Sequence, residues 1–263
     1  MSKTLGLALG SGGARGVAHI GFLQALEEAG IKPDYISGCS MGAVIGGCYA
    51  SGISAMEIKD VVLKLRPRDI VDLSPAVITK MALLRSKKIE ELLTTYLGGK
   101  KIEELEIPFR CVATELHSGK LHVFKKGNAA KAVQASSSIP VVFRPVKDSG
   151  KMFVDGGCIC RVPVKVVKEM GADVVVAVDV LKNTEEHVGE IKNIIAMALR
   201  VFDIMDANQT KITRNLEDGL CDLYLEPEMK GHSQYAIKDL DTIYNYGYEL
   251  GKENAEKIRE LLN

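Results

Sequence analysis

Residues 35–50 have the sequence YISGCSMGAVIGGCYA, an apolar segment centred on a serine. The short run 35–38 predicts a buried strand, and the small apolar residues of 41–50 predict a buried helix. Between them lies GCSMG at residues 38–42, a G-x-S-x-G motif in the strand–turn–helix setting that gives this motif meaning. Such a sharp turn needs small flanking residues, and the helix that follows it favours developing negative charge. Ser40 is therefore the candidate nucleophile.

Strands and helices alternate on both sides of this segment. Predicted strands cover residues 4–9, 109–115, 120–124, 141–146, 152–154, 174–178 and 220–225. Predicted helices cover residues 17–28, 54 onward, 66–99 with breaks at two prolines, 129–135, 191–215, and 235–262 with a break at Gly247. The alternation predicts one doubly wound α/β domain over residues 1–263. Ligands of such folds bind at the carboxyl ends of the strands, and the unusual loops of this chain follow predicted strands.

The composition is that of an ordinary soluble protein. Lys plus Arg and Asp plus Glu each number 34, so the formal net charge is zero, which argues against general nucleic-acid binding. The six cysteines form no C-x-x-C pair, and we expect buried free thiols in a reducing cytosol. The uncharged run from Tyr35 to Met56 is rich in Gly and Ser, which favours a buried helix over a membrane span. The apolar patch at 5–9 is too short for the core of a signal peptide, so we expect a cytoplasmic protein.

A second unusual loop, GSGGARG at residues 10–16, also follows a predicted strand and precedes a helix. It does not match the dinucleotide motif G-x-G-x-x-G, because Arg15 takes the sixth position. No Gly-Lys-Ser/Thr follows either, as a phosphate-binding loop requires. The remaining interpretation is an anion site made of backbone amides, which beside a serine nucleophile forms an oxyanion hole.

A serine nucleophile needs a base, and histidine is the usual one. The five histidines are His19, His117, His122, His187 and His232, and none lies in a motif-like setting. His19 falls one turn into the first predicted helix, where we expect a buried or capping role. The segment Asp155-Gly156-Gly157 follows a short predicted strand, although Asp-Gly alone is also a common turn.

Together these segments resemble the patatin-like phospholipases, in particular their small bacterial members. The family's oxyanion motif G-G-G-x-R/K-G is matched by residues 11–16, with Ser11 in place of the first glycine, and its elbow by residues 38–42. Its A-S-x-x-x-P element is matched by residues 135–140 and its D-G-G/A motif by residues 155–157. The four motifs occur in the family's order and spacing. The motif-bearing part covers about residues 4–180.

The resemblance implies a three-layer α/β/α domain around a mostly parallel sheet, with the C-terminal elements packed on the same domain. It implies a serine acyl hydrolase that cleaves carboxylic esters of phospholipids or lysophospholipids through a Ser40–Asp155 dyad and an acyl-enzyme, with no cofactor and no metal. A base of this kind must be shielded from water, because burial raises the basicity of a carboxylate. We expect the amides of Gly12, Gly13 and Met41 to form the oxyanion hole. The supporting loop residues are Gly10, Arg15, Gly16, Gly38, Gly42, Gly156 and Gly157.

This chain departs from the family pattern after the aspartate motif, where Cys160-Arg161 precede the Val-Pro-Val of residues 162–164. Arg161 either alters substrate preference or lines the surface. Asp179 follows the predicted strand 174–178, and it either lies near the active face or caps a turn.

Other activities stay open. They are an acyltransferase on the same dyad, a nonenzymatic regulatory protein that retains the fold, and a cysteine enzyme using Cys39, whose side chain should point away from the tip of the elbow. A metal site at Glu115, His117 and His122 has no recognised ligand spacing.

The expected partners, besides a lipid or ester substrate, follow from two amphipathic segments. Residues 66–88 are a candidate lid or interfacial helix for transient contact with a membrane surface, which would make the protein peripheral there. Residues 191–215 are a candidate dimer contact. For both segments we favour packing against the core.

Overall fold

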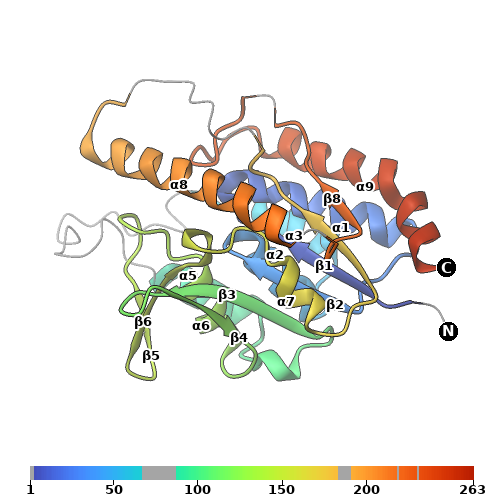
Figure 1. Ribbon diagram of the computed structural model, residues 1–263, viewed down its shortest axis with the longest axis horizontal. Coiled ribbons are helices and arrows are strands. Elements are labelled where there is room, and N and C mark those ends of the chain that lie inside the picture. The colour runs from blue at the N-terminus through green and yellow to red at the C-terminus, as the bar shows by residue number, and fades with distance from the viewer. Residues whose placement is uncertain (1–2, 67–86, 183–190, 218, 230) are drawn as a thin grey trace.

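The computed structural model describes residues 3–66, 87–182, 191–217, 219–229 and 231–263 (Figure 1). Its central feature is an eight-stranded sheet. The strands are β1 Leu5–Leu9, β2 Tyr35–Cys39, β3 Phe109–Glu115, β4 Lys120–Phe124, β5 Val146–Asp148, β6 Lys151–Asp155, β7 Val174–Val178 and β8 Leu223–Leu225. The helices are α1 Ala18–Glu28, α2 Met41–Ala50, α3 Ala55–Val62, α5 Lys87–Tyr96, α6 Ala129–Ser136, α7 Val164–Lys168, α8 Ile194–Leu216 and α9 Leu240–Leu262. Short 3₁₀ turns are η1 Gly13–Val17, η3 Ile102–Glu104 and η4 Gly156–Cys158.

The strand order in the sheet is β5-β6-β3-β2-β1-β7-β8, and β4 pairs with β3 outside this path. The pairs β1–β2, β1–β7, β2–β3 and β7–β8 are parallel. The pairs β3–β4, β3–β6 and β5–β6 are antiparallel. The prediction of a mostly parallel sheet is thus confirmed, and the three antiparallel pairs make the sheet mixed. The two unusual loops follow β1 and β2, which are neighbours, so both lie at the same edge of the sheet.

Helices cover both faces of the sheet (Figure 1). Side chains alternate along β1, as strand geometry requires. Leu5, Leu7 and Leu9 face a core shared with α1, α2 and α9. Ala8 faces the opposite side, where it packs with Val164 and other residues around α7. This arrangement confirms the three-layer α/β/α architecture.

Helix α9 differs from the prediction at both the start and the middle. It begins at Leu240 and not near residue 235, because Asp239 adopts a left-handed conformation with φ 54° that interrupts the helical backbone. It does not break at Gly247. A Cβ at Gly247 would lie 1.8 Å from the carbonyl oxygen of Ala18, so the missing side chain lets α9 touch α1. The glycine therefore marks a helix contact.

The predicted strand 141–146 is wrong, since β5 begins only at Val146. Val141 has φ 71°, and the amide of Phe143 donates to the carbonyl of Ile139 at 2.9 Å, so the chain turns here. The apolar, β-branched composition of this segment resembles a strand, but the turn overrides its strand propensity.

The predicted helical region 66–99 is described from Lys87 onward, where α5 lies. The candidate lid or interfacial helix at 66–88 falls almost entirely outside the described residues. None of the helices that the structure describes is both long and apolar enough to cross a membrane.

Candidate active site

Ser40 occupies the sharp turn between β2 and α2. Its backbone has φ 53° and ψ −121°, a strained conformation for a residue with a side chain. The carbonyl oxygen of Ser40 accepts hydrogen bonds from the amides of Ala43 and Val44 at 2.9 and 3.0 Å, which begins α2. The predicted strand–turn–helix elbow is present, and the strain is held by the first turn of the helix.

The sheet register explains how Asp155 reaches this serine. Cys39, the last residue of β2, pairs with Val112 of β3, and Asp155, the last residue of β6, pairs with the next residue, Ala113. Strand β4 occupies the other edge of β3, so β2 and β6 lie end to end along one edge. They run toward each other, because β2 is parallel and β6 antiparallel to β3. Their ends therefore meet although 115 positions separate Ser40 from Asp155.

The two side chains are directly hydrogen-bonded. The hydroxyl of Ser40 donates to Asp155 Oδ2 at 2.6 Å. The amide of Gly157 donates to Asp155 Oδ1 at 2.8 Å, and the Cys39 thiol lies 3.9 Å from the same oxygen. Ser40 is 3% exposed and Asp155 is 1% exposed. The carboxylate is therefore fixed in orientation and shielded from water.

This shielding changes the acid–base behaviour of Asp155. Burial raises its pKa from 3.8 to about 6, and the hydrogen bonds from Ser40 and Gly157 partly oppose the shift. A solvated aspartate is a poor base, whereas a carboxylate with a pKa near 6 accepts a proton more readily and is still mostly ionised at neutral pH.

The segment 135–140 supports both halves of the site. The hydroxyl of Ser136 accepts the amide of Ser40 at 3.0 Å. The carbonyl of Ser138 accepts the amide of Asp155 at 2.9 Å. One short loop thus sets the backbone position of the serine and of the aspartate. The sequence motif identified this loop, but only the structure shows what it contacts.

The glycine-rich loop 10–16 lies against the elbow. A Cβ at Gly42 would lie 2.2 Å from the carbonyl oxygen of Leu9, immediately before the loop. Gly16 approaches the side chain of Met41 so closely that a Cβ there would lie 2.3 Å from its Cγ. The two loops can touch only because glycine occupies these positions.

Three backbone amides remain available at this contact. Within the described parts of the chain, the amides of Gly12, Gly13 and Met41 donate to no acceptor. They belong to the glycine loop and to the first residue of α2, the two loops that touch. The structure therefore places the predicted amides on adjoining loops. The other predicted supporting glycines, Gly10, Gly38, Gly156 and Gly157, lie at the ends of β1, β2 and β6.

Arg15 anchors the glycine loop to the C-terminal part of the chain. Its side chain is buried and donates to the carbonyl oxygens of His232 at 2.7 Å and Lys182 at 3.3 Å. The neighbouring Ala14 amide donates to the carbonyl of Gln234 at 2.8 Å. These contacts hold the glycine loop against residues 182, 232 and 234, as the predicted supporting role of Arg15 requires.

The described histidines form no hydrogen bond with Ser40 or Asp155. His19 is fully buried, with Nε2 2.8 Å from the carbonyl oxygen of Gly10. Burial lowers its pKa to about 4, so the ring is neutral, and its expected buried role is confirmed. His187 lies outside the described residues.

One of the candidate metal ligands, Glu115, has another role. The Glu115 carboxylate accepts the amides of His117 and Ser118 at 3.0 and 2.9 Å, which closes the β3–β4 turn. Among the described residues, no three His, Cys, Asp or Glu side chains are grouped to hold a metal ion. The thiol of Cys39 is also unsuited to catalysis, since burial raises its pKa well above 9.0.

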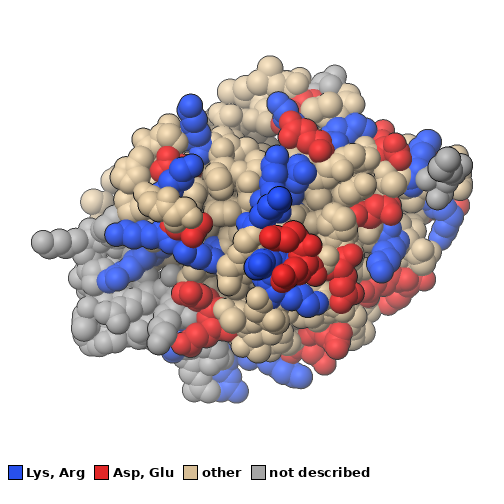
Figure 2. All heavy atoms as spheres, turned by 90° about the horizontal axis from the view of Figure 1, so that it is seen from below, with Lys and Arg blue, Asp and Glu red and all other residues tan. Residues whose placement is uncertain are grey.

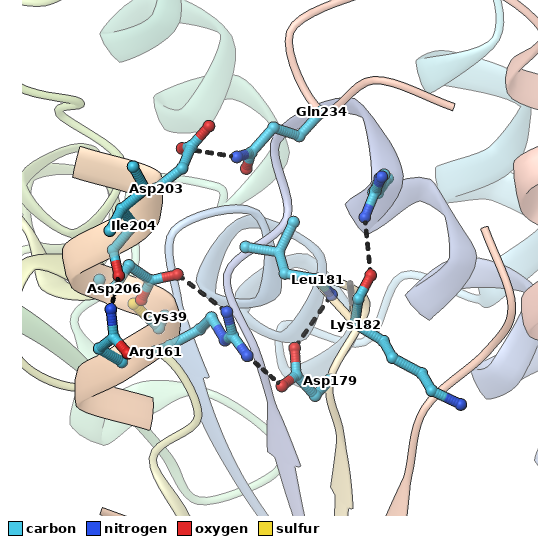
Figure 3. Close-up of polar contacts among 12 residues, drawn as sticks. Cys39, Arg161, Asp179, Leu181, Lys182, Asp203, Ile204, Asp206 and Gln234 are labelled. Carbon is cyan, nitrogen blue, oxygen red and sulfur yellow. Dashed lines mark hydrogen bonds and ion pairs between the residues drawn. The ribbon is translucent and has the colours of Figure 1, made fainter. Parts of the chain in front are cut away.

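A buried ionic network lies next to this site, and sequence patterns did not reveal it (Figure 3). The guanidinium of Arg161 donates to Asp179 at 2.8 Å and to Asp206 of α8 at 3.0 Å. All three side chains are buried, so the idea that Arg161 lines the surface is wrong. Asp179 also accepts the amide of Leu181 at 3.0 Å, which gives it a turn-capping role as well as an ionic one. No local pattern marks Asp206, because an acidic residue on an amphipathic helix is ordinarily expected to face solvent.

Known proteins resemble this chain in both sequence and fold. A model of the patatin-like phospholipase family matches residues 7–168. An uncharacterized NTE family protein of Mycobacterium tuberculosis is 40% identical over 177 residues, which are 67% of this chain and 49% of that protein. The lysophospholipase nte1 of Neurospora crassa is 28% identical over 293 residues, 98% of this chain and 18% of that protein. The chain thus spans about half the length of the mycobacterial relative, and less of the fungal one.

Two solved structures share the fold. VipD from Legionella pneumophila aligns with a TM-score of 0.54 and 14% identity over 97% of this chain and 67% of its own. The type III effector ExoU, of Pseudomonas aeruginosa, aligns with a TM-score of 0.52 and 13% identity over 98% of this chain and 53% of its own. At such identity the similarity concerns the architecture alone.

Proposed function

Because this chain belongs to the patatin-like phospholipase family, we propose that it is a serine acyl hydrolase that cleaves carboxylic esters of lipids. The observation that carries the proposal is the 2.6 Å hydrogen bond between Ser40 and the buried Asp155. The proposed substrates are phospholipids or lysophospholipids. The name of one relative, a lysophospholipase of Neurospora crassa, supports this substrate class.

In the proposed first step, Ser40 Oγ attacks the ester carbonyl carbon while its proton passes to Asp155 Oδ2. The carbonyl electron pair moves to the oxygen, and the resulting oxyanion binds the amides of Gly12, Gly13 and Met41. The intermediate collapses as the bond to the leaving alcohol breaks. Asp155 returns its proton to that alcohol, and the acyl group stays on Ser40.

In the second step, water attacks the acyl carbon and gives its proton to Asp155. The bond to Ser40 Oγ then breaks, the serine recovers its proton, and the fatty acid leaves. An acyltransferase would share the first step and replace water with another acceptor.

The test uses Ser40→Ala and Asp155→Asn with a soluble short-chain ester and with a lysophospholipid. Each substitution should lower kcat by at least about 10³-fold, since it removes the nucleophile or the base. A fluorophosphonate should phosphonylate Ser40 with release of HF, so intact-protein mass spectrometry should show the phosphonyl adduct on the parent chain and none on Ser40→Ala.

The matched controls alter the same residue types outside the dyad: Ser149→Ala in the exposed β5–β6 turn, and Asp148→Asn at the end of β5, where the carboxylate pairs with Lys131 at 2.8 Å. Both should retain the parent rate. Near-full activity in Asp155→Asn would refute the dyad. Release of free fatty acid in water identifies hydrolysis, and acyl transfer to an added lysolipid identifies the acyltransferase.

A further inference from the structure

The glycine loop that carries the candidate oxyanion amides is bound at its start to two other parts of the chain. The amide of Gly10 donates to the carbonyl of Val178 at 3.0 Å, and the amide of Ser11 donates to the carbonyl of Arg161 at 2.9 Å. Val178 is the last residue of β7, and Arg161 lies shortly after η4. The backbone is therefore attached to both β7 and Arg161 immediately before it reaches Gly12.

The glycine loop also rests on residues 179–182, hereafter the β7 loop. Val180 packs so closely against Gly12 that a Cβ on Gly12 would lie 2.4 Å from its Cγ2. The carbonyl of Lys182 accepts a hydrogen bond from the side chain of Arg15 at 3.3 Å. The position of Gly12 therefore depends on where the β7 loop lies.

Asp179 joins these two supports of the glycine loop. Its Oδ1 accepts the amide of Leu181 at 3.0 Å, which bends the β7 loop, and its Oδ2 accepts the guanidinium of Arg161 at 2.8 Å (Figure 3). The hydroxyl of Tyr224 donates to the same Oδ2 at 3.0 Å. One carboxylate thus ties the β7 loop to the residue whose carbonyl binds Ser11.

The Arg161–Asp179 pair is shielded from water, with side chains that are 7% and 1% exposed. The charges on the face shown in Figure 2 differ, because there Lys and Arg side chains lie at the surface among Asp and Glu. Exposed ion pairs of that kind hold their groups weakly, since water and salt screen them. A buried pair with hydrogen bonds is costly to break, so it can fix a loop in one position.

We propose that Arg161 and Asp179 are positioning residues that hold the glycine loop where the amides of Gly12 and Gly13 can bind an oxyanion. The proposal deepens the proposed acyl hydrolase function and rests on it for its effect on the rate. Neither side chain needs to touch the substrate. Donors of an oxyanion hole act only while they keep their places, and a displacement of about 1 Å can cost on the order of 10²-fold in rate.

Asp206 of α8 provides a matched control for Asp179. It binds the same guanidinium at 3.0 Å, but within the described part of the chain its other carboxylate oxygen meets no donor. Asp206 therefore ties Arg161 to α8, whereas Asp179 ties Arg161 to the β7 loop. Removal of either carboxylate costs Arg161 one buried partner, and only the loss of Asp179 should disturb the glycine loop.

The inward position of Asp206 also corrects an expectation about α8. Six apolar residues of this helix are at least half exposed: Ile194, Met197, Val201, Met205, Ile212 and Leu216. Asp206 is buried on the inner side, which is polar. The expectation that residues 191–215 pack their apolar side against the core is therefore wrong.

The first experiment compares Asp179→Asn with Asp206→Asn on a soluble short-chain ester, at a pH well above the pKa of Asp155. We expect Asp179→Asn to lower kcat by about tenfold or more with little change in KM, because the displaced amides matter only in the transition state. Asp206→Asn should stay within about twofold of the parent. A parent-like kcat in Asp179→Asn, or equal losses in both variants, would overturn the proposal.

A transition-state analogue separates positioning from loss of folded protein. Ser40 Oγ adds to the carbonyl carbon of a trifluoromethyl ketone, its proton passes to Asp155, and the carbonyl oxygen becomes an oxyanion in the hole. Partial unfolding would lower kcat without changing the inhibition constant of the folded fraction. We expect the inhibition constant of Asp179→Asn to rise in parallel with its loss of kcat/KM. An unchanged inhibition constant would refute positioning.

A second variant leaves every charge in place. Val180→Ala removes methyl groups that pack on Gly12, and Val176→Ala removes the same groups from the middle of β7. Both valines are fully buried, so similar losses of stability are expected. Only Val180→Ala should lower kcat and raise the inhibition constant. Equal kcat in these two variants would contradict the proposal.

A final measurement does not need catalysis. The amides of Gly10 and Ser11 are hydrogen-bonded, so they should exchange slowly with solvent. Hydrogen exchange with mass spectrometry should show faster exchange of residues 10–16 in Asp179→Asn and parent-like exchange in Asp206→Asn. Faster exchange in Asp179→Asn with no ester hydrolysis by the parent would refute the proposed function and leave the loop support intact. Hydrolysis by the parent with unaltered exchange and kcat in Asp179→Asn would do the reverse.

Discussion

At the residue scale, Asp155 sets the pH dependence of the proposed reaction. Its pKa is raised to about 6 by burial, and the base must be ionised. We expect kcat/KM for a soluble ester to rise about tenfold per pH unit below that pKa and to level off above it. The folded state binds this proton more tightly than the unfolded state. The same group therefore lowers the free energy of unfolding progressively as the pH rises from about 4 to about 6.

Asp206, a neighbouring carboxyl group, titrates in a similar pH range, so its effect on the rate must be distinguished from that of Asp155. Burial raises the pKa of Asp206 to about 7, against the influence of Arg161, and the charge of Asp155 contributes to the shift. Asp206→Asn removes that second titration. An inflection in the pH–rate profile that persists in Asp206→Asn belongs to Asp155. An inflection that disappears would assign the pH dependence to Asp206 instead.

At the scale of single elements, the position of α8 depends on Arg161. This residue joins the helix, through Asp206, to Asp179 after β7. Arg161→Ala leaves two buried carboxylates without their cation, and we expect the free energy of unfolding to fall by about 3–5 kcal/mol in urea titrations. Arg214→Ala is the matched control, because Arg214 lies on the same helix, is about half exposed, stacks on Tyr224 and makes a 3.2 Å ion pair with Glu226, which follows β8. That change should cost less than about 1 kcal/mol, and equal effects of the two would show that α8 is not held by the buried network.

The contact between α1 and α9 makes a second prediction at this scale. Gly247→Ala places a methyl group against the Ala18 carbonyl, where a Cβ would lie 1.8 Å from the oxygen. The two helices must move apart, so we expect a loss of about 1–3 kcal/mol and a lower Tm by calorimetry. Lys252→Ala, at an exposed position of α9, should change stability by less than about 0.5 kcal/mol. A stable Gly247→Ala protein would mean that the helix pair adapts to the methyl group.

At the scale of the whole molecule, local patterns predicted the elements better than their orientation. The strands around the Ser40 and Asp155 motifs were predictable, because apolar runs and glycine loops report local backbone directly. Helical periodicity also located α8, but it defines two faces without saying which one is inward. Here Arg161, far away in the sequence, reverses the usual choice by pairing with Asp206. The prediction of a strand at residues 141–146 was wrong for a related reason. The turn at Val141 depends on its folded surroundings and overrides the strand propensity of the segment.

The resemblance identified the serine and the aspartate, but the sequence could not show how they meet. Their contact depends on the register of β3, in which neighbouring residues Val112 and Ala113 receive the ends of β2 and β6. Pairing of distant strands leaves no local pattern along the chain. The same holds for the amides of Gly12 and Gly13, which meet no acceptor among the described residues because of how distant segments fold around them.

The shared edge of β3 has a consequence for how the protein could be divided. Strands β2 and β6 reach each other through a third strand, and no covalent link between them is needed for the encounter. A cleavage in the exposed turn at Ser118-Gly119 would leave the hydroxyl on one fragment and the carboxylate on the other. Ester hydrolysis by the two fragments mixed together would then report reassembly of the sheet, with neither fragment active by itself.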